Sequence, residues 1–246
     1  MKKGLIYFLG PLIILFIWKI VTFFGFVKSV ILPSPESIIQ ALIFELQNGY
    51  LIKNIVVSIF RVFSGFAIAL IIGIPLGLLM GWFKGVRKFF DGLIEILRPI
   101  PPIAWIPLAI LWFGIGELSK IYVIAYGAFF PIVLNSILGV KSIDSNLLKL
   151  AKSMNLKGFK LFKEVIFPGS LPSIFTGLRI GLGVGWMCLI AAELIAAQSG
   201  LGYMIEESRL LLLTSRVILG MLIIGLLGFL SDRLIRFFEK RLIHWL

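Results

Sequence analysis

The stretch that decides how this chain folds is Lys141–Ser173, KSIDSNLLKLAKSMNLKGFKLFKEVIFPGSLPS. Asp144 or Ser145 can cap a helix over Asn146–Met154, because short polar side chains accept hydrogen bonds from the free N–H groups of a first turn. Asn155 tolerates the left-handed conformation that ends many helices. The apolar positions of this segment fall on one face, which consists of Leu147, Leu148, Ala151 and Met154.

A second short helix is predicted at about Gly158–Ile166 in the same stretch. Pro168 and Pro172 are expected to close it, because proline lacks the N–H that a helix interior needs. The stretch therefore predicts two short helices at an angle, rich in lysine and displayed in water. A loop that only linked two neighbouring segments would not require such structure.

The composition around this stretch indicates a membrane protein. Of the 246 residues, 59% are apolar and 15% are charged, and the mean hydropathy is +1.06. A soluble domain carries about 45–50% apolar and about 25% charged residues. The excess apolar surface must face lipid, so we expect an all-α membrane protein formed by residues 1–246 as a single domain.

Six stretches are long and apolar enough to cross a bilayer, which takes about 20 residues. They lie at about Leu5–Val27, Ile55–Gly81, Leu93–Phe113, Ile121–Val140, Ile174–Ala197 and Arg216–Phe237. A further segment, Pro35–Asn48, follows the helix-start signature Ser34-Pro35-Glu36 and predicts an amphipathic helix at the interface. Residues 1–53 then hold the first span and this helix, and residues 54–240 hold the core with the loop 141–173.

The distribution of lysine and arginine orients these spans. With the N-terminus inside, the cytoplasmic segments hold 15 of these residues and the outer segments hold 5, counted from the sequence. Both termini are therefore predicted to be cytoplasmic. The formal charge of +12 follows from the same bias, so nucleic acid is not an expected partner.

Few residues are available for enzyme chemistry. Cys188 is the one cysteine and His244 the one histidine, which excludes an intrachain disulfide and makes a catalytic triad or histidine metal centre unexpected. The sequence contains no Gly-x4-Gly-Lys-Ser/Thr phosphate loop. We therefore expect no catalytic, cofactor-binding or metal-binding residue, and ATP hydrolysis, if the chain uses it, must occur in another subunit.

Glycines recur at every fourth residue in two of the spans. One ladder is Gly73, Gly77 and Gly81, and the other is Gly177, Gly181 and Gly185. Small residues at this spacing let helix backbones approach closely. Tight packing within one bundle is the favoured interpretation, and a subunit interface or moving contact is the alternative.

The run Arg98-Pro99-Ile100-Pro101-Pro102 must begin or break the third span, because three prolines cannot sit inside a regular helix. Irregular backbone in a membrane is tolerated where it lines a cavity, so a break beside a pathway and a simple helix start at the surface both remain open. Ionisable residues inside spans face protein or water. The candidates for a pathway or gate are Arg61, Pro101, Glu193, Gly200 and Tyr203. We favour a structural Arg61–Glu193 pair over an anion contact, and expect Arg179 to extend to the cytoplasmic surface.

The loop resembles the cytoplasmic "EAA" loop of ABC importer permeases, patterned E-A-A-x3-G-x9-I-x-L-P. Lys149, Leu150 and Ala151 stand at its first three positions, Asn155 stands at the glycine, and Pro168 at the proline. The spacing is kept, while Lys149 replaces the glutamate. The resemblance continues in segments spread over about 200 residues, which include Leu32-Pro33-Ser34-Pro35, Trp112-Phe113-Gly114-Ile115-Gly116 and Ser199-Gly200-Leu201-Gly202-Tyr203.

Together these motifs look like the permease branch for nitrate, aliphatic sulfonates and taurine, which has the type I ABC importer fold. The resemblance implies a plasma (inner) membrane permease of bacterial type. It acts with a second permease copy, two ATP-binding subunits that hold ATP and Mg, and an extracytoplasmic binding protein. The ATPase-docking residues implied by the loop are Lys149, Leu150, Ala151, Met154, Asn155 and Leu156.

Other functions remain as alternatives. One alternative is the same type of importer with a thiamine precursor, riboflavin or another small solute as its substrate. Nothing in this sequence distinguishes that substrate class from the anions. An ion-coupled secondary transporter or channel would be expected to show a relay of charged residues within the membrane. A membrane enzyme would need a cluster of His, Asp, Glu or Cys near one surface, and the sequence offers none.

Overall fold

The computed structural model describes residues 2–243, with the side chains of all of these except residues 2–9, 11 and 152. All the regular secondary structure of this part of the chain is helical, as expected. The helices are α1 (Lys2–Phe23), α2 (Pro35–Gln47), α3 (Tyr50–Trp82), α4 (Lys84–Leu97), η1 (Pro102–Trp105), α5 (Ile106–Phe113), α6 (Glu117–Lys141), α7 (Ser145–Ser153), α8 (Gly158–Leu161), η2 (Phe162–Ile166), α9 (Phe167–Ala196), α10 (Leu201–Leu210) and α11 (Thr214–Leu242).

Four helical segments in the described residues are long and apolar enough to cross a membrane. They are α3, α6, the continuous run Gly158–Ala196 and α11, and they correspond to the second, fourth, fifth and sixth predicted spans. A fifth crossing results if α4 and η1–α5 count together. The first predicted span overlaps α1, whose part with described side chains is a shorter apolar helix, so the count of six stays a prediction.

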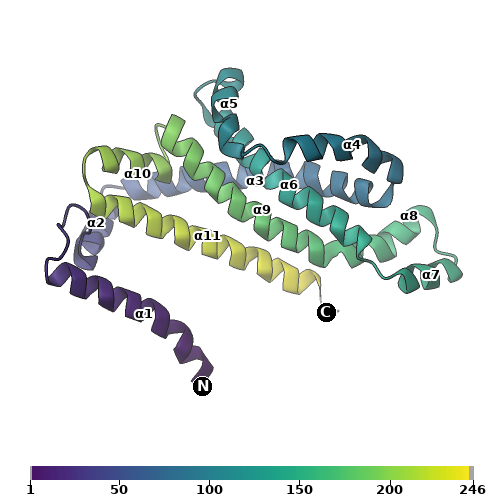
Figure 1. The fold of residues 1–246 in the computed structure, drawn as a ribbon, viewed down its shortest axis with the longest axis horizontal. Coiled ribbons are helices and arrows are strands. Elements are labelled where there is room, and N and C mark those ends of the chain that lie inside the picture. The colour runs from purple at the N-terminus through teal and green to yellow at the C-terminus, as the bar shows by residue number, and fades with distance from the viewer. Residues whose placement is uncertain (1, 244–246) are drawn as a thin grey trace. The chain divides into compact units, whose positions relative to one another are not determined.

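The third predicted span, Leu93–Phe113, is not one helix. The α4 helix ends at Leu97, and the chain turns by 86° before η1 and α5 continue (Figure 1). Arg98 still has helical angles, with φ −56° and ψ −41°, but Pro99 has no N–H to continue the hydrogen bonds of α4, so the helix ends before it. Pro101 is extended, with φ −58° and ψ 134°, and Pro102 starts η1, where a missing N–H costs nothing. The span therefore breaks at the prolines.

The chain forms two compact units, and within the described residues the first comprises 2–57 and 198–225. The α2 helix lies in this unit and begins as predicted, with the Ser34 hydroxyl accepting from the Ser37 N–H at 3.3 Å. Lys19 donates to Glu36 and thereby lowers the pKa of that carboxyl. The buried Glu45 of α2 accepts from Arg216 Nε at 2.5 Å. Polar contacts thus hold α2 to the end of α1 and the start of α11.

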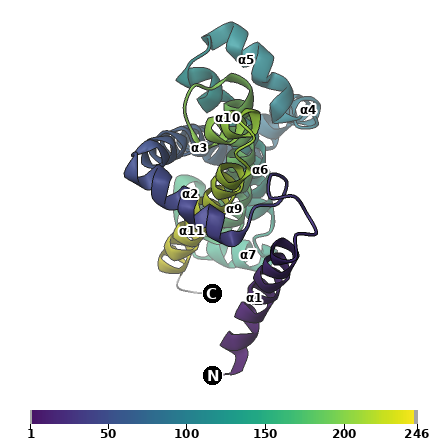
Figure 2. The ribbon, with the colours of Figure 1, turned by 90° about the vertical axis from the view of Figure 1, so that its left-hand side faces the viewer.

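The second unit comprises 58–197 and 226–243, and α6 lies at its centre. The α6 and α9 helices run side by side in Figure 1 and stay together in the view along the long axis in Figure 2. Two thirds of the most apolar stretch of α6 is buried (67%). A helix buried to this extent in a membrane protein contacts other helices on most of its faces.

Both glycine ladders pack against α6, which confirms the favoured interpretation of packing within one bundle. A Cβ atom on Gly77 of α3 would lie 2.5 Å from the Ser136 Cβ, and one on Gly177 of α9 would lie 2.6 Å from the Asn135 Cβ. Real Cβ atoms essentially never approach so closely, so only glycine fits at these two positions. Through these glycines, α3 and α9 both pack closely against α6.

Candidate functional site

The first half of the candidate loop folds as predicted. Helix α7 covers Ser145–Ser153, and the Asp144 carboxylate accepts from the Asn146 N–H at 2.8 Å, which identifies Asp144 as the capping side chain. Asn155 has φ +62°, and the next N–H, that of Leu156, donates to the Ala151 carbonyl at 3.0 Å. This geometry is a left-handed helix end, for which asparagine is the best non-glycine residue.

The exposed surface of α7 differs from the predicted docking set in one residue. Leu150 and Met154 are 58% and 69% exposed, and Lys149 and Asn155 are also exposed. Leu156 is half-buried, whereas Ala151 is only 4% exposed and lies inside the unit. An alanine side chain that is covered by its own chain cannot supply contact area to a partner. The exposed apolar residues of the predicted set are therefore Leu150 and Met154, and Leu147 of α7 is exposed beside them.

The second half of the loop does not form a separate helix, so the predicted ending at Pro168 and Pro172 is wrong. Helix α8 continues through a π-helical turn, η2, directly into α9, giving one helix over Gly158–Ala196. The Phe167 N–H donates to the Phe162 carbonyl, five residues back. Pro168 then occupies the first turn of α9, where its missing N–H is tolerated, and Pro172 lies inside α9.

The α8–η2 segment is anchored to the rest of its unit. Leu161 and Ile166 are buried, and the Phe162 ring packs edge-on against Trp82 at the end of α3, with ring centroids 6.3 Å apart. The loop is therefore an arm that extends from α9 and carries α7 at its tip (Figure 1).

Arg61 and Glu193 form the buried ion pair that the sequence analysis favoured. Arg61 Nη1 lies 2.7 Å from Glu193 Oε1, and the two side chains are 1% and 0% exposed. The Ser58 hydroxyl also donates to Glu193, at 2.8 and 3.0 Å from its two oxygens. A buried charge needs such partners, because removing one of them leaves an uncompensated ion.

Glu117 belongs to the same cluster and was not singled out from the sequence. Arg61 Nε and Nη2 each lie 2.6 Å from a Glu117 oxygen, so the guanidinium holds this carboxylate through two bonds. The cluster therefore ties α3, α6 and α9 together. The signal available in the sequence was an acidic residue in a first helical turn, directly after Gly116.

Arg179 also pairs with a carboxylate that sequence reasoning missed. Its Nε lies 2.8 Å from Asp232 Oδ1, and Asp232 also accepts from Arg236 at 2.7 Å. Asp232 lies inside the last predicted span, so the rule that flagged Arg61 would also have flagged it.

The two gate candidates after α9 lie in the first unit and have local structural roles. Gly200 has φ +113°, and its N–H donates to the Asn54 side chain at 2.7 Å. The Tyr203 hydroxyl lies 3.4 Å from Glu207, and Tyr50 donates to the same carboxylate at 2.5 Å. A positive φ of this kind favours glycine, so the turn depends on Gly200.

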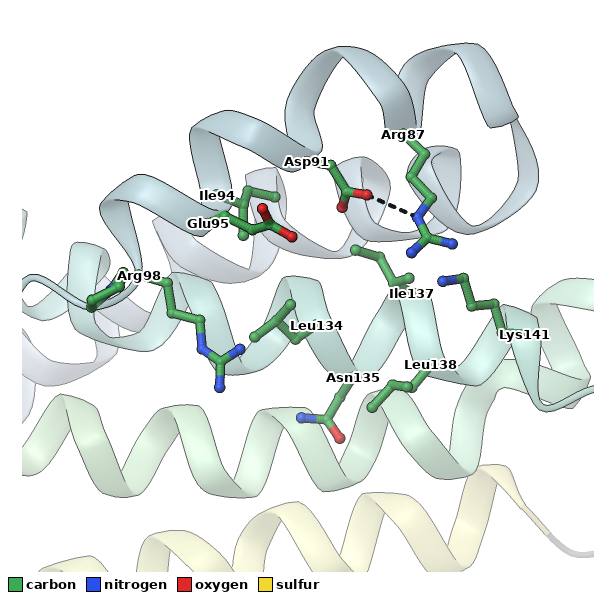
Figure 3. Close-up of a pocket in the computed structure, with 11 residues that line it drawn as sticks. Arg87, Asp91, Ile94, Glu95, Arg98, Leu134, Asn135, Ile137, Leu138 and Lys141 are labelled. Carbon is green, nitrogen blue, oxygen red and sulfur yellow. Dashed lines mark hydrogen bonds and ion pairs between the residues drawn. The ribbon is translucent and has the colours of Figure 1, made fainter.

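The proline break borders two neighbouring cavities in the second unit. The wider one, of about 780 Å³, lies between α4 and α6 and is drawn in Figure 3. The narrower one, of about 340 Å³, is lined by Ile100 and Pro102 of the break, by α6 and by α9. Pro101 lies between these two lining residues but lines neither cavity. Both cavities share Arg98, Leu134 and Asn135, none of which was predicted as a site residue.

Known proteins with similar sequences are membrane subunits of transporters. Residues 73–244 match the family model described as "Binding-protein-dependent transport system inner membrane component". A putative ABC transporter permease of Methanocaldococcus jannaschii is 44% identical, over 96% of this chain and 90% of that protein. A putative aliphatic sulfonates transport permease of Bacillus subtilis is 36% identical (99% and 87%), and the taurine transport system permease of Escherichia coli is 37% identical (95% and 86%).

A solved structure agrees at the level of the fold. A chain from inward-facing conformations of the MetNI methionine ABC transporter matches with a TM-score of 0.64, over 76% of this chain and 95% of that chain, at 19% identity. The helical architecture, the apolar spans and the sequence matches lead to one conclusion. The chain belongs to the family of binding-protein-dependent transport system inner membrane components, the multi-pass permease subunits of ABC importers in the plasma membrane.

Proposed function

We propose that this chain is one half of a permease dimer that imports a small anion of the sulfonate, taurine or nitrate kind. An extracytoplasmic binding protein delivers the anion, and two ATP-binding subunits supply the energy. The relatives named for aliphatic sulfonates and for taurine support the substrate class, since both match more than nine tenths of this chain. The continuous helix Gly158–Ala196, which leads from the loop into the fifth predicted span, supports transport driven by ATP.

This continuous helix is the observation that carries the proposal. An ATPase that binds α7 acts on the tip of an arm whose other end is α9, and α9 packs along α6 through Gly177 and Gly181. A packed interior transmits displacement and deforms little. Movement of the tip is therefore passed on to the helices that border the cavities.

The proposed membrane arrangement has six spans, with both termini and the loop in the cytoplasm. The excess of lysine and arginine in the expected cytoplasmic segments supports it. A second copy of this chain completes the permease, and ATP and Mg bind to the two ATPase subunits, with no cofactor in this chain. Lys149, Leu150, Met154, Asn155 and Leu156 form the proposed docking surface, and Ala151 supports it from inside.

The cluster of charged residues around Arg61 has a structural role in this proposal. Arg61, Glu117 and Glu193 already satisfy one another, so an anion would have to displace a carboxylate to reach Arg61. Gly200 and Tyr203 shape the turn at the start of α10. The broken backbone around Pro101 lies between residues that border the pathway.

The test is transport by the complete assembly. The permease is co-expressed with a candidate ATPase and binding protein sought among its neighbouring genes, reconstituted in liposomes, and assayed for uptake of labelled taurine, ethanesulfonate and nitrate. We expect uptake that requires ATP inside and binding protein outside. Uptake driven by an ion gradient without ATP would contradict the proposal, and transport of riboflavin or a thiamine precursor in place of the anions would overturn its substrate class.

A further inference from the structure

The two cavities beside α6 meet at an arginine. Arg98 lines both the wider cavity of about 780 Å³ and the narrower one of about 340 Å³. It is the last residue before the proline run, and the Tyr126 hydroxyl fixes the end of α4 by donating to the Leu97 carbonyl at 2.8 Å. The position of Arg98 is therefore set by backbone that is held on α6.

Arg98 differs from most other arginines of the described chain in its partners. Six of them, Arg61, Arg87, Arg179, Arg209, Arg216 and Arg236, have a carboxylate within ion-pair distance. Between residues 2 and 243 no carboxylate is placed so close to Arg98. In Figure 3 its guanidinium extends away from α4, and the one dashed line joins Arg87 to Asp91.

The narrower cavity is otherwise apolar apart from Asn135. Its walls include Phe130, Leu134, Ile180 and Val184, and the Asn135 amide donates to the Pro131 carbonyl at 2.8 Å. Small-molecule sites of about 300–1,000 Å³ typically combine apolar walls with a few polar groups that fix orientation. A guanidinium binds planar or tetrahedral oxyanions through two parallel N–H bonds. This chemistry fits a small organic anion with a short apolar body.

We propose that Arg98 is the residue of the transport pathway that contacts the anion, at the junction of the two cavities. The inference rests on the proposed function, because it assigns a pathway residue to that importer. An ionisable side chain without a partner is costly in a membrane protein unless it faces water or a solute. An anion passing between the cavities supplies the missing partner for part of each transport cycle.

Cysteine labelling tests the inference without requiring transport. Cys188, the one cysteine of the chain, is replaced by alanine, and Val184→Cys then places a single thiol in the narrower cavity. The full-length permease in membranes is treated with anionic sulfonatoethyl methanethiosulfonate or with cationic trimethylammonioethyl methanethiosulfonate. Ile71→Cys, on an exposed apolar part of α3, is the matched control.

The quantity measured is the rate of modification by the anionic reagent divided by the rate for the cationic reagent. For Val184→Cys we expect this ratio to be at least about tenfold higher than for a free thiol in solution. Arg98→Gln should abolish this preference, and Arg98→Lys should keep most of it because the charge remains. An equal preference in the Arg98→Gln variant would overturn the inference. A thiol at position 184 that reacts with neither reagent would also overturn it, since the cavity would then be closed to solutes.

Uptake by the reconstituted importer separates this inference from the proposed function. We expect Arg98→Gln to reduce ethanesulfonate uptake at least about tenfold, because a charged hydrogen bond to the anion is lost. Binding of the ATPase should be unchanged. Full uptake by this variant would overturn the role of Arg98 and leave the importer intact. A charge-dependent labelling preference in a protein that transports no anion would support the anion contact and contradict the proposed substrate.

Discussion

Two arginines of helices packed on α6, Arg61 of α3 and Arg98 at the end of α4, lie in opposite surroundings. Toward α3 and α9, glycines leave no room for a Cβ, and Arg61 is enclosed with Glu193 and Glu117. Toward α4 and η1, the proline run leaves two cavities, and Arg98 faces them without a carboxylate partner among residues 2–243. In the proposed account, one face of α6 holds the bundle together and the other face meets the solute.

Replacing Arg61 should give the largest effect on stability. Arg61→Met removes the charge that neutralises Glu193, and breaking a buried pair costs about 3–5 kcal/mol. We expect a large drop in the melting temperature of the purified protein in detergent. The control is Arg87→Ala, which breaks the exposed Arg87–Asp91 pair and should cost less than about 0.5 kcal/mol. Equal shifts for both variants would remove the distinction between the two arginine environments.

The glycine ladders give an intermediate effect. In Gly77→Ala the new Cβ would lie 2.6 Å from the Val133 carbonyl oxygen, a backbone atom that cannot turn aside. Overpacking of this kind costs about 1–3 kcal/mol. Gly183→Ala in α9 is the matched control, because no heavy atom lies within 4 Å of the added Cβ and helix propensity improves. Thermal melting should separate the two variants. An unchanged melting temperature for Gly77→Ala would show that the ladder has room for an added Cβ atom.

Arg98 should give the smallest effect on stability. A substitution away from buried partners changes the free energy of unfolding by less than about 0.5 kcal/mol, so we expect Arg98→Gln to melt like the unmodified protein. The same melting assay that ranks Arg61→Met measures it. A loss of stability comparable to that of Arg61→Met would mean that Arg98 is a structural residue, and the contrast between the two faces would fail.

Local signals in the sequence predicted the features that depend on neighbouring residues. The Asp144 cap, the left-handed Asn155, the helix that starts after Ser34 and the close packing of the glycine ladders all follow from short-range patterns. The Arg61–Glu193 pair was predicted because two opposite charges in apolar spans have few other ways to avoid desolvation.

Features that depend on tertiary packing were not predicted. Proline rules are local, so they placed a helix end at Pro168, where the π-helical turn η2 lets the helix continue. The burial of Ala151 depends on which face of α7 meets the rest of the unit, and an apolar stripe alone does not reveal that. The cavities at Arg98 arise from the 86° bend, whose direction the prolines do not specify.

The most direct test of the account is copurification of the ATPase subunit with this permease and with its Leu150→Asp variant. Leu150 and Met154 are the exposed apolar residues of the docking surface, and loss of an interface hot spot costs about 2 kcal/mol or more. We predict that the ATPase copurifies with the unmodified protein and with Lys149→Gln, and is lost from Leu150→Asp, which stays in the membrane. Equal recovery of the ATPase with Leu150→Asp, or none with the unmodified permease, would contradict the role given to the loop.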